Sequence, residues 1–335
     1  MVRDEPNSGH IADIARSMRM TRIGHCGLVC DFHYRAICIG ITCVELFSTK
    51  DRNQMPAPTP NPRGADFWNS TTGHAWVAQQ AAISDVFTSV TSVSFSAAAA
   101  KPGEHVVDIG CGTGDTLLDF AKAVGRSGAV LGVDVSVPML GFAKHRAAEA
   151  GYSNVSCALA DATTYAFEPR WADLVYSRFG VMFFDDPVEA FSNIRSGMKP
   201  SARLVFVCFR TMPESSWFRV PVEAARPHLP AQPPADPLAP GMFSFAREER
   251  VRGILSDAGF REVALEAVDV PMHGKDIAQS IAFITQAGPL PAILENGSEE
   301  QRTRATEAVR EALAANIGAD GRGLQAGLWL VSALA

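Results

Sequence analysis

The sequence predicts an α/β fold built around a doubly wound sheet. Short apolar runs alternate with amphipathic helical stretches from residue 104 to 210, as expected for parallel strands joined by crossover helices. A glycine-rich turn at residues 110–114 follows the first apolar run, and aspartates end the second and third runs. Because ligands of a doubly wound sheet bind beyond the carboxyl ends of its strands, the same stretch predicts where a ligand binds.

The first strand leads directly into the glycine-rich turn. The apolar run 106–109 predicts a buried strand, and Gly110, Gly112 and Gly114 allow a sharp turn and a close approach of a ligand to the main chain. Apolar residues then recur at helical spacing as far as Val124. The N-terminus of this helix is expected to aim its free N–H groups at the bound molecule.

The spacing of these glycines separates two classes of cofactor. A dinucleotide site usually reads G-x-G-x-x-G, but Asp115 stands where the last of those glycines would be. The turn resembles motif I of the class I S-adenosylmethionine-dependent methyltransferases, D-x-G-x-G-x-G, which Asp108 and the three glycines match in full. The alternatives are a nicotinamide-dependent oxidoreductase, a non-catalytic S-adenosylmethionine-binding protein, and a tight turn that binds nothing.

Acidic residues at the next two strand ends favour an adenosine site. Asp134 ends the second predicted strand, where a carboxylate can accept hydrogen bonds from both ribose hydroxyls; NAD enzymes share this feature. Met139 lies where the methyltransferase family packs an apolar side chain on adenine. Asp161 and Ala162 resemble the pair that holds the adenine amino group in that family.

The remaining elements continue the alternation and extend it to the end of the chain. Asp186–Pro187 is expected to open a helix that Lys199–Pro200 closes, and residues 200–202 form a polar turn where the family usually has Pro-Gly-Gly. Ser298 and Gln301 predict a capping box. Strands are expected at 106–109, 129–135, 155–160, 172–177, 203–209, 260–268 and 324–334, and helices at 117–124, 137–151, 187–199, 248–259 and 298–313.

The resemblance implies a Rossmann-like, mostly parallel sheet of seven strands in the order 3-2-1-4-5-7-6. It also implies S-adenosyl-L-methionine as the cofactor. The cofactor-binding residues that it implies are Trp76, Asp108, Gly110, Cys111, Gly112, Thr113, Gly114, Asp134, Val135, Met139, Asp161, Ala162, Ser177 and Arg178.

Two segments precede the cofactor-binding domain, which is expected at residues 101–335. Residues 1–54 hold four cysteines and show no clear period, which predicts a poorly structured extension that is either disordered or an over-extended gene start before Met55. A metal-binding cysteine cluster is the alternative. Residues 55–100 predict a helical cap, in which Trp68–Asn69 and the stretch from Gly73 to Trp76 resemble the caps of small-molecule methyltransferases. Aromatic rings there could exclude water and stabilise a sulfonium, or only staple the cap to the core.

A lid is predicted within residues 211–245. Six prolines from Pro227 to Pro240 are incompatible with a helix, so residues 226–243 are expected to form a stiff loop over the pocket; a plain linker is the alternative. The apolar side chains predicted to line the substrate pocket, which favour a small, partly hydrophobic acceptor, are Phe179, Met182, Phe183, Met242 and Phe243.

The reaction that the resemblance implies is an in-line displacement, in which a lone pair of the acceptor attacks the sulfonium methyl group. The candidate catalytic residues are His74, Arg178 and Asp185, and His228 and His273 are further polar residues to test. Arg178 could instead hold a carboxylate, since a permanent cation is a poor base. Oxygen, nitrogen, carbon and sulfur acceptors all stay open.

Composition agrees with a soluble enzyme, which is expected to be cytoplasmic, and disfavours nucleic-acid binding. The chain has 335 residues, 30 Lys and Arg against 36 Asp and Glu, and a formal net charge of -6. Nucleic-acid binding needs clustered cations, and the apolar stretch at 36–47 is too short to span a bilayer. Cys111, Cys157 and Cys208 are expected to be small buried residues in a reducing compartment, with no metal site. The oligomeric state stays open.

Overall fold

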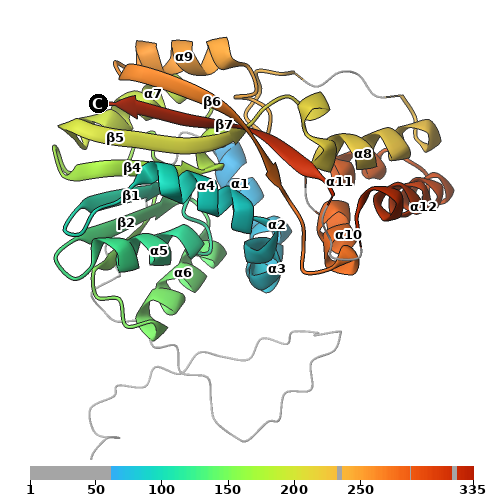
Figure 1. Cartoon of the computed structure of the whole chain (residues 1–335), viewed down its shortest axis with the longest axis horizontal. Helices are drawn as coiled ribbons and strands as arrows, with labels where there is room; N and C mark the ends of the chain where they lie inside the picture. The colour runs from blue at the N-terminus through green and yellow to red at the C-terminus, as the bar shows by residue number, and fades with distance from the viewer. Residues whose placement is uncertain (1–61, 232–235, 287, 319–322) are drawn as a thin grey trace, which may run out of the picture. The chain divides into compact units, whose positions relative to one another are not determined.

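The computed structural model describes residues 62–231, 236–286, 288–318 and 323–335. Its centre is a seven-stranded sheet in the order β3-β2-β1-β4-β5-β7-β6 (Figure 1). Only β7 runs antiparallel to its neighbours. This confirms the expected fold and strand order. The strands are β1 (His105–Ile109), β2 (Ala129–Asp134), β3 (Val155–Leu159), β4 (Ala172–Arg178), β5 (Met198–Phe209), β6 (Arg261–Pro271) and β7 (Gln325–Leu334).

Helices cover both faces of the sheet. On one face, α4 (Thr88–Ala98), α5 (Asp115–Val124) and α6 (Val137–Glu149) bury a core around Phe120 and Tyr176. On the other face, α7 (Pro187–Ser196) and α9 (Glu248–Asp257) bury a second core that includes Phe191 and Phe206. Burial of these apolar side chains is the main favourable term that holds the layers together.

Helix α7 ends earlier than predicted from the sequence. The helix ends at Ser196, before the expected stop at Lys199–Pro200, and β5 begins at Met198, which pairs with Ala172 of β4. The pairing register then shifts, and this irregularity takes up residues 199–202. A proline is tolerated there because a strand irregularity needs no ladder hydrogen bond from it. The expected polar turn is therefore the irregular start of β5.

The described part of the predicted cap is helical, in four short pieces. These are α1 (Pro62–Asn69), α2 (Thr71–Ala78), α3 (Gln80–Val86) and α4. Gly73 allows α1 and α2 to touch, because a Cβ there would lie 2.0 Å from the carbonyl oxygen of Trp68. The Asn69 side chain donates to the carbonyl of Val135 and accepts from the N–H of Val137, which fixes the cap to the start of α6. The predictions for residues 1–54 lie outside the described residues.

A second group of helices lies at one end of the sheet (Figure 1). It consists of α8 (Ser216–Ala225) after β5 and of α10 (Ile277–Gln286), α11 (Leu290–Glu295) and α12 (Glu299–Asn316) between β6 and β7. The expected capping box of Ser298 and Gln301 is present at the start of α12. Neither α10 nor α11 was predicted.

The proline-rich stretch 226–243 is less extended at its start than expected. It opens with a single 3-10 turn, η5 (Arg226–His228), because Pro227 occupies its first turn, where no N–H is needed. The other short turns are η3 (Gly180–Phe183) and η4 (Met212–Glu214).

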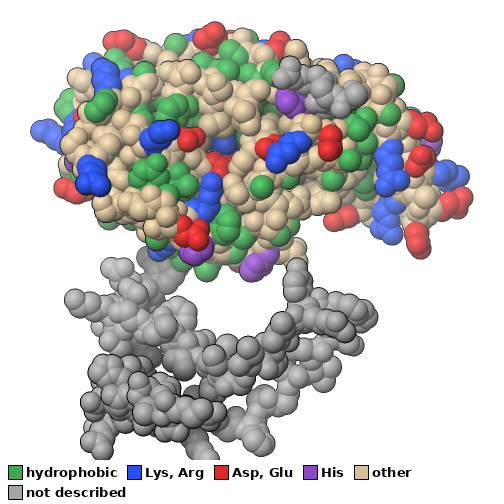
Figure 2. Space-filling view, turned by 60° about the horizontal axis from the view of Figure 1, so that its bottom comes forward, with side chains coloured by type: hydrophobic (Ala, Val, Ile, Leu, Met, Phe, Trp, Pro, Cys, Tyr) green, Lys and Arg blue, Asp and Glu red, His purple; other side chains and the backbone are tan. Residues whose placement is uncertain are grey.

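No helix among the described residues is both long and apolar enough to cross a bilayer. On the face in Figure 2, acidic and basic side chains are interspersed over the described surface. Cys111 and Cys208 are buried, whereas Cys157 is only half-buried. A cytoplasmic location and the lack of a nucleic-acid partner stay predictions.

Candidate functional site

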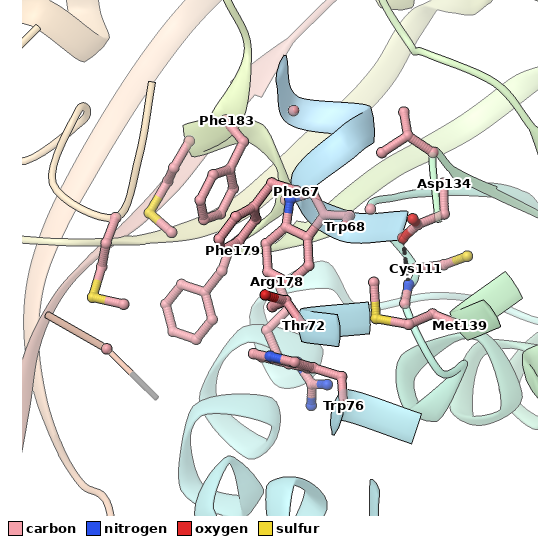
Figure 3. Close-up of a pocket in the computed structure, with 18 of the residues that line it drawn as sticks. Phe67, Trp68, Thr72, Trp76, Cys111, Asp134, Met139, Arg178, Phe179 and Phe183 are labelled. Carbon is pink, nitrogen blue, oxygen red and sulfur yellow. Dashed lines mark hydrogen bonds between the residues drawn. The ribbon is translucent and has the colours of Figure 1, made fainter. Parts of the chain in front are cut away.

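A cavity of about 630 Å³ opens at the carboxyl ends of the central strands. One end is formed by the glycine-rich turn and the acids after β2 and β3, and the other end is almost entirely apolar. Figure 3 shows the cap residues Trp68, Thr72 and Trp76 between these ends. The residues of the first end include Gly110, Cys111, Gly112, Thr113, Asp134, Val135, Met139, Asp161 and Ala162.

The glycine-rich turn needs residues without a Cβ. Gly110, Gly112 and Gly114 have φ values of 68°, 53° and 87°, in the left-handed region that other residues seldom adopt. A Cβ on Gly110 would lie 2.7 Å from Cα of Gly180, and one on Gly114 would lie 2.9 Å from Cβ of Ala143. The turn is therefore packed against neighbouring backbone on one side and faces the cavity on the other.

Asp134 is fixed by the main chain and keeps free acceptor capacity. Its Oδ1 accepts from the N–H of Ser136 and its Oδ2 from the N–H of Gly112, each at 2.8 Å. Burial raises the pKa of Asp134, and these backbone donors oppose that rise. Each carboxylate oxygen has a second lone pair, so the group can accept two further hydrogens from a ligand in the cavity.

Asp161 closes the same end of the cavity. Its side chain is buried, and its Oδ1 accepts from the N–H of Thr163 at 2.8 Å. The side chains of Ala162 and Met139 line the cavity near it. A flat, apolar ring with a polar edge could bind here, with its edge directed at Asp161 and its faces against these side chains.

Asp108 lies at the end of β1 and does not line the cavity itself. Its Oδ2 accepts from the hydroxyl of Thr116 at 2.6 Å, whereas its Oδ1 is buried without any hydrogen-bond partner. Burial raises the pKa of Asp108 to about 7. An unpartnered buried carboxylate oxygen is costly, and a cationic donor bound at the turn would relieve that cost.

Two more of the predicted cofactor residues, Ser177 and Gly114, support the site from outside the cavity. The Ser177 hydroxyl donates to the carbonyl of Ile109 at 2.7 Å and accepts from the N–H of Gly180 at 3.1 Å. It therefore connects the carboxyl ends of β1 and β4.

Aromatic rings of the cap form the middle of the cavity wall. The rings of Trp68 and Trp76 meet edge to face with centroids 5.6 Å apart, and Trp68 meets Phe183 in the same way at 5.3 Å (Figure 3). Such rings exclude water and present their electron-rich faces to a cation.

The apolar end contains all five predicted substrate-pocket residues, Phe179, Met182, Phe183, Met242 and Phe243. Phe179 has a φ of 71°, which is unfavourable for a residue with a bulky side chain. Its ring stacks on Phe209 with centroids 4.2 Å apart. This stacking helps to offset the backbone strain and holds the ring in the wall.

Other lining residues were missed in the sequence. Many of them come from the end of β5, from α8, and from the segment between β6 and β7, which contains α10 and α11. The apolar spacing of residues 277–284 was a signal for α10. Its position over the cavity depends on antiparallel pairing that the sequence does not display. These residues include Phe209, Trp217, Phe218, Met272, Phe283, Gln286, Gly288, Pro289, Pro291, Ala292 and Glu295.

Of the three catalytic candidates, the structure brings only Arg178 to the cavity. His74 and Asp185 are exposed and lie outside its wall, as do the half-buried His228 and His273. Any catalytic role of His74 or Asp185 stays a prediction.

A family model described as a methyltransferase domain matches residues 106–201, from β1 into β5. Aklanonic acid methyltransferase DauC of Streptomyces sp. (strain C5) is 34% identical over 39% of this chain and 62% of its own length. The 2-phytyl-1,4-naphtoquinone methyltransferase of Trichormus variabilis is 33% identical over 36% of this chain and 52% of its own length. This chain thus spans less than two thirds of either relative.

Among solved structures, phosphoethanolamine N-methyltransferase 2 of Haemonchus contortus in complex with S-adenosyl-L-methionine has a similar fold. It aligns with a TM-score of 0.52 and 20% identity, over 81% of this chain and 59% of that one. At this identity the likeness concerns the fold alone.

Proposed function

We propose that the chain is a class I S-adenosylmethionine-dependent methyltransferase, which binds S-adenosylmethionine and methylates a small, partly hydrophobic acceptor. The match of residues 106–201 to a methyltransferase domain, the methyltransferase relatives and the strand order support this proposal. The observation that carries the proposal is the arrangement of three buried acids around the glycine-rich turn. Asp108, Asp134 and Asp161 lie at or just after the ends of β1, β2 and β3. Asp134 and Asp161 line the cavity, and Asp108 lies behind the turn with one oxygen that has no hydrogen-bond partner.

The residues present fit the cofactor. Asp134 would accept from the two ribose hydroxyls, and Asp161 would accept from the adenine amino group while Met139 packs on the ring. The unpartnered Oδ1 of Asp108 supports an ammonium group bound at the turn, where the glycines allow close approach. When bound, the cofactor would supply an electrophilic methyl group on a sulfonium.

The protein's part in the reaction is to bind, to orient and to exclude water. Trp68 and Trp76 cover the middle of the cavity, and the rings of Phe179 and Phe183 begin its apolar end. These walls would hold the acceptor's nucleophile in line with the methyl group, and alignment alone can supply several kcal/mol of rate enhancement. None of the lining residues is a histidine among those that the structure describes. We therefore propose that alignment is the main catalytic contribution.

The charge of the cavity favours an acceptor without an anionic group. Arg178 is the one cation among the described lining residues, and it already has a carboxylate partner, Asp115, which it shares with Arg146. The other charged lining residues are the acids Asp134, Asp161 and Glu295. A phosphate or carboxylate would be desolvated here without a counter-ion, which is costly.

The names of the two relatives suggest an acid and a quinone as acceptors. Of these two classes, the apolar and aromatic walls favour a quinone-type ring.

A nicotinamide-dependent oxidoreductase fits the site less well. In a dinucleotide site, a glycine in place of Asp115 would let the helix N-terminus receive a pyrophosphate. Here the Asp115 carboxylate lies at the first residue of α5 and already pairs with Arg146 and Arg178. These two cations are therefore not free to bind the phosphates.

Thermal unfolding with S-adenosylmethionine, S-adenosylhomocysteine and NAD tests the proposal. We expect the first two ligands to raise the melting temperature, and stabilisation by NAD alone would refute the cofactor assignment. Turnover should then be assayed against a panel of quinols, phenols and amines, each with and without a carboxylate. Methyl transfer to neutral members is expected. Tight cofactor binding without any transfer would instead favour a non-catalytic binding protein.

A further inference from the structure

A cluster of charged side chains lies where the cap meets the glycine-rich turn, with Asp115 at its centre. The Asp115 side chain is only 11% exposed, and its Oδ1 accepts from Arg146 of α6 at 2.7 Å. Arg178, at the end of β4, lies with its guanidinium 3.5 Å from Oδ2. Gln80 and Ser84 of α3 each donate to the same carboxylate at 2.7 Å. One carboxylate therefore joins the cap, α5, α6 and β4.

Arg178 has no other anionic partner in direct contact among the described residues. It donates to the hydroxyl of Thr91 at 2.6 Å, and its guanidinium lies 5.2 Å from the ring centroid of Phe87. Both Arg178 and Phe87 line the cavity. Asp115 is thus the carboxylate that offsets part of the positive charge of Arg178 and Arg146, and its loss would make this part of the wall more positive.

The other acids near the cluster do not contact Arg178. Asp108 lies beneath the turn and Asp119 lies one turn further along α5, and among the described residues neither forms an ion pair with Arg178. Burial acts to raise the pKa of Asp115, but Arg178, Ser84 and Arg146 overcome it and hold that pKa below its usual value. Asp115 is therefore the ionised carboxylate in contact with Arg178.

We infer that Asp115 is a positioning residue that allows the cavity to accept a positively charged sulfonium, and so sets the preference between S-adenosylmethionine and S-adenosylhomocysteine. The inference rests on the proposed function, because the sulfonium is the charge that separates these two ligands. Without Asp115, the Arg178 guanidinium would be an unneutralised cation in the wall of a poorly solvated cavity. It would repel the sulfonium and leave the neutral thioether almost unaffected.

The hydrogen bonds from Gln80 and Ser84 add a second effect that can be told apart from the first. They attach α3, and with it the cap, to the glycine-rich turn. Loosening of the cap would weaken both ligands, and it would also change the ratio if Trp68 and Trp76 moved away from the sulfonium. The double variant that lacks both Asp115 and Arg178 separates the two effects, because it removes the cation while the hydrogen bonds from the cap stay weakened.

The test is calorimetric titration of both ligands into the wild-type protein and the Asp115→Asn variant, which has nearly the same shape. We expect the dissociation constant of S-adenosylmethionine to rise about tenfold more than that of S-adenosylhomocysteine, which corresponds to about 1.4 kcal/mol of added repulsion between like charges in one cavity. Equal losses for the two ligands, or no loss, would overturn the inference. Glu300→Gln, which removes an acid from an exposed ion pair on α12, is the matched control and should leave the ratio unchanged.

A second variant keeps the test decisive if Asp115→Asn does not fold. Arg178→Met removes the cation and should shift the ratio toward S-adenosylmethionine, and an unchanged ratio would refute the electrostatic role. In the double variant, the ratio should return toward the wild-type value. If the wild-type protein binds neither ligand, the proposed function itself fails. If it binds both and the ratio does not respond, only the role of Asp115 fails.

Discussion

Replacement of Asp134 by Ala is expected to remove most of the affinity for the cofactor and leave the fold intact. Both carboxylate oxygens are held by main-chain N–H groups at 2.8 Å, so the group is already oriented before a ligand arrives. A hydrogen bond to a charged group contributes about 1.5–3 kcal/mol, and Asp134 offers two to the ribose. Loss of both hydrogen bonds to the ribose is expected to cost about 3 kcal/mol, which is roughly a hundredfold in affinity.

Isothermal titration with S-adenosylhomocysteine measures this loss, and circular dichroism and the melting temperature report whether the fold is retained. Asp257→Ala, which removes an exposed acid at the end of α9, is the matched control and should bind like the wild type. An Asp134→Ala variant that is folded and binds with unchanged affinity would remove Asp134 from the site and refute the placement of the adenosine.

Three further predictions concern the turn and the walls. Gly114→Ala should lower the free energy of unfolding by about 1–3 kcal/mol, because its φ is 87° and its new Cβ would lie 2.9 Å from Ala143. Gly141→Ala is the control: a Cβ there meets nothing within 4 Å in α6, so that variant should be as stable as the wild type or up to about 1 kcal/mol more stable. Equal losses from denaturant melts would contradict the packing argument. Affinity for S-adenosylhomocysteine should fall by about tenfold for each pH unit below about 7, because Asp108, whose raised pKa is about 7, must be ionised to hold an ammonium group. The same raised pKa means that the ligand-free fold loses stability as the pH rises from about 4 through about 7. Asp108→Asn should flatten both profiles, and an unchanged pH dependence of binding would exclude this role. Phe209→Ala should cost about 3–5 kcal/mol of stability by chemical denaturation, because it removes the ring on which the strained Phe179 stacks; a loss below about 1 kcal/mol would show that the stacking does not support that backbone.

Local chemistry explains why much of the fold could be predicted. Ser298 and Gln301 form their capping box within one turn of helix, and Asp186 caps α7 through the N–H of Glu189. Such signals need only neighbours in the sequence, and the alternation of strands and helices then leaves few possible topologies. The glycine-rich turn was recognisable for the same reason, since its conformation depends on its own residues.

The parts that could not be predicted depend on contacts between distant residues. Phe283 of α10 lines the cavity because α10 belongs to the segment that connects the antiparallel strands β6 and β7. No local pattern in the sequence shows where that segment lies. From the sequence, Asp115 was interpreted only as the residue that replaces a glycine. Its contacts could not be predicted, because its partners Gln80 and Arg178 lie 35 and 63 positions away in the chain. His74 and Asp185 were chosen for chemistry alone, and the structure exposes both side chains outside the cavity.

An experimental structure with S-adenosylhomocysteine bound would show directly where the ligand lies. We expect the ribose at Asp134, the adenine edge at Asp161, and the sulfur facing the apolar end of the cavity beside Trp76 and Phe183. Ligand bound elsewhere on the protein, or bound in this cavity without contact to Asp134 and the glycine-rich turn, would contradict it.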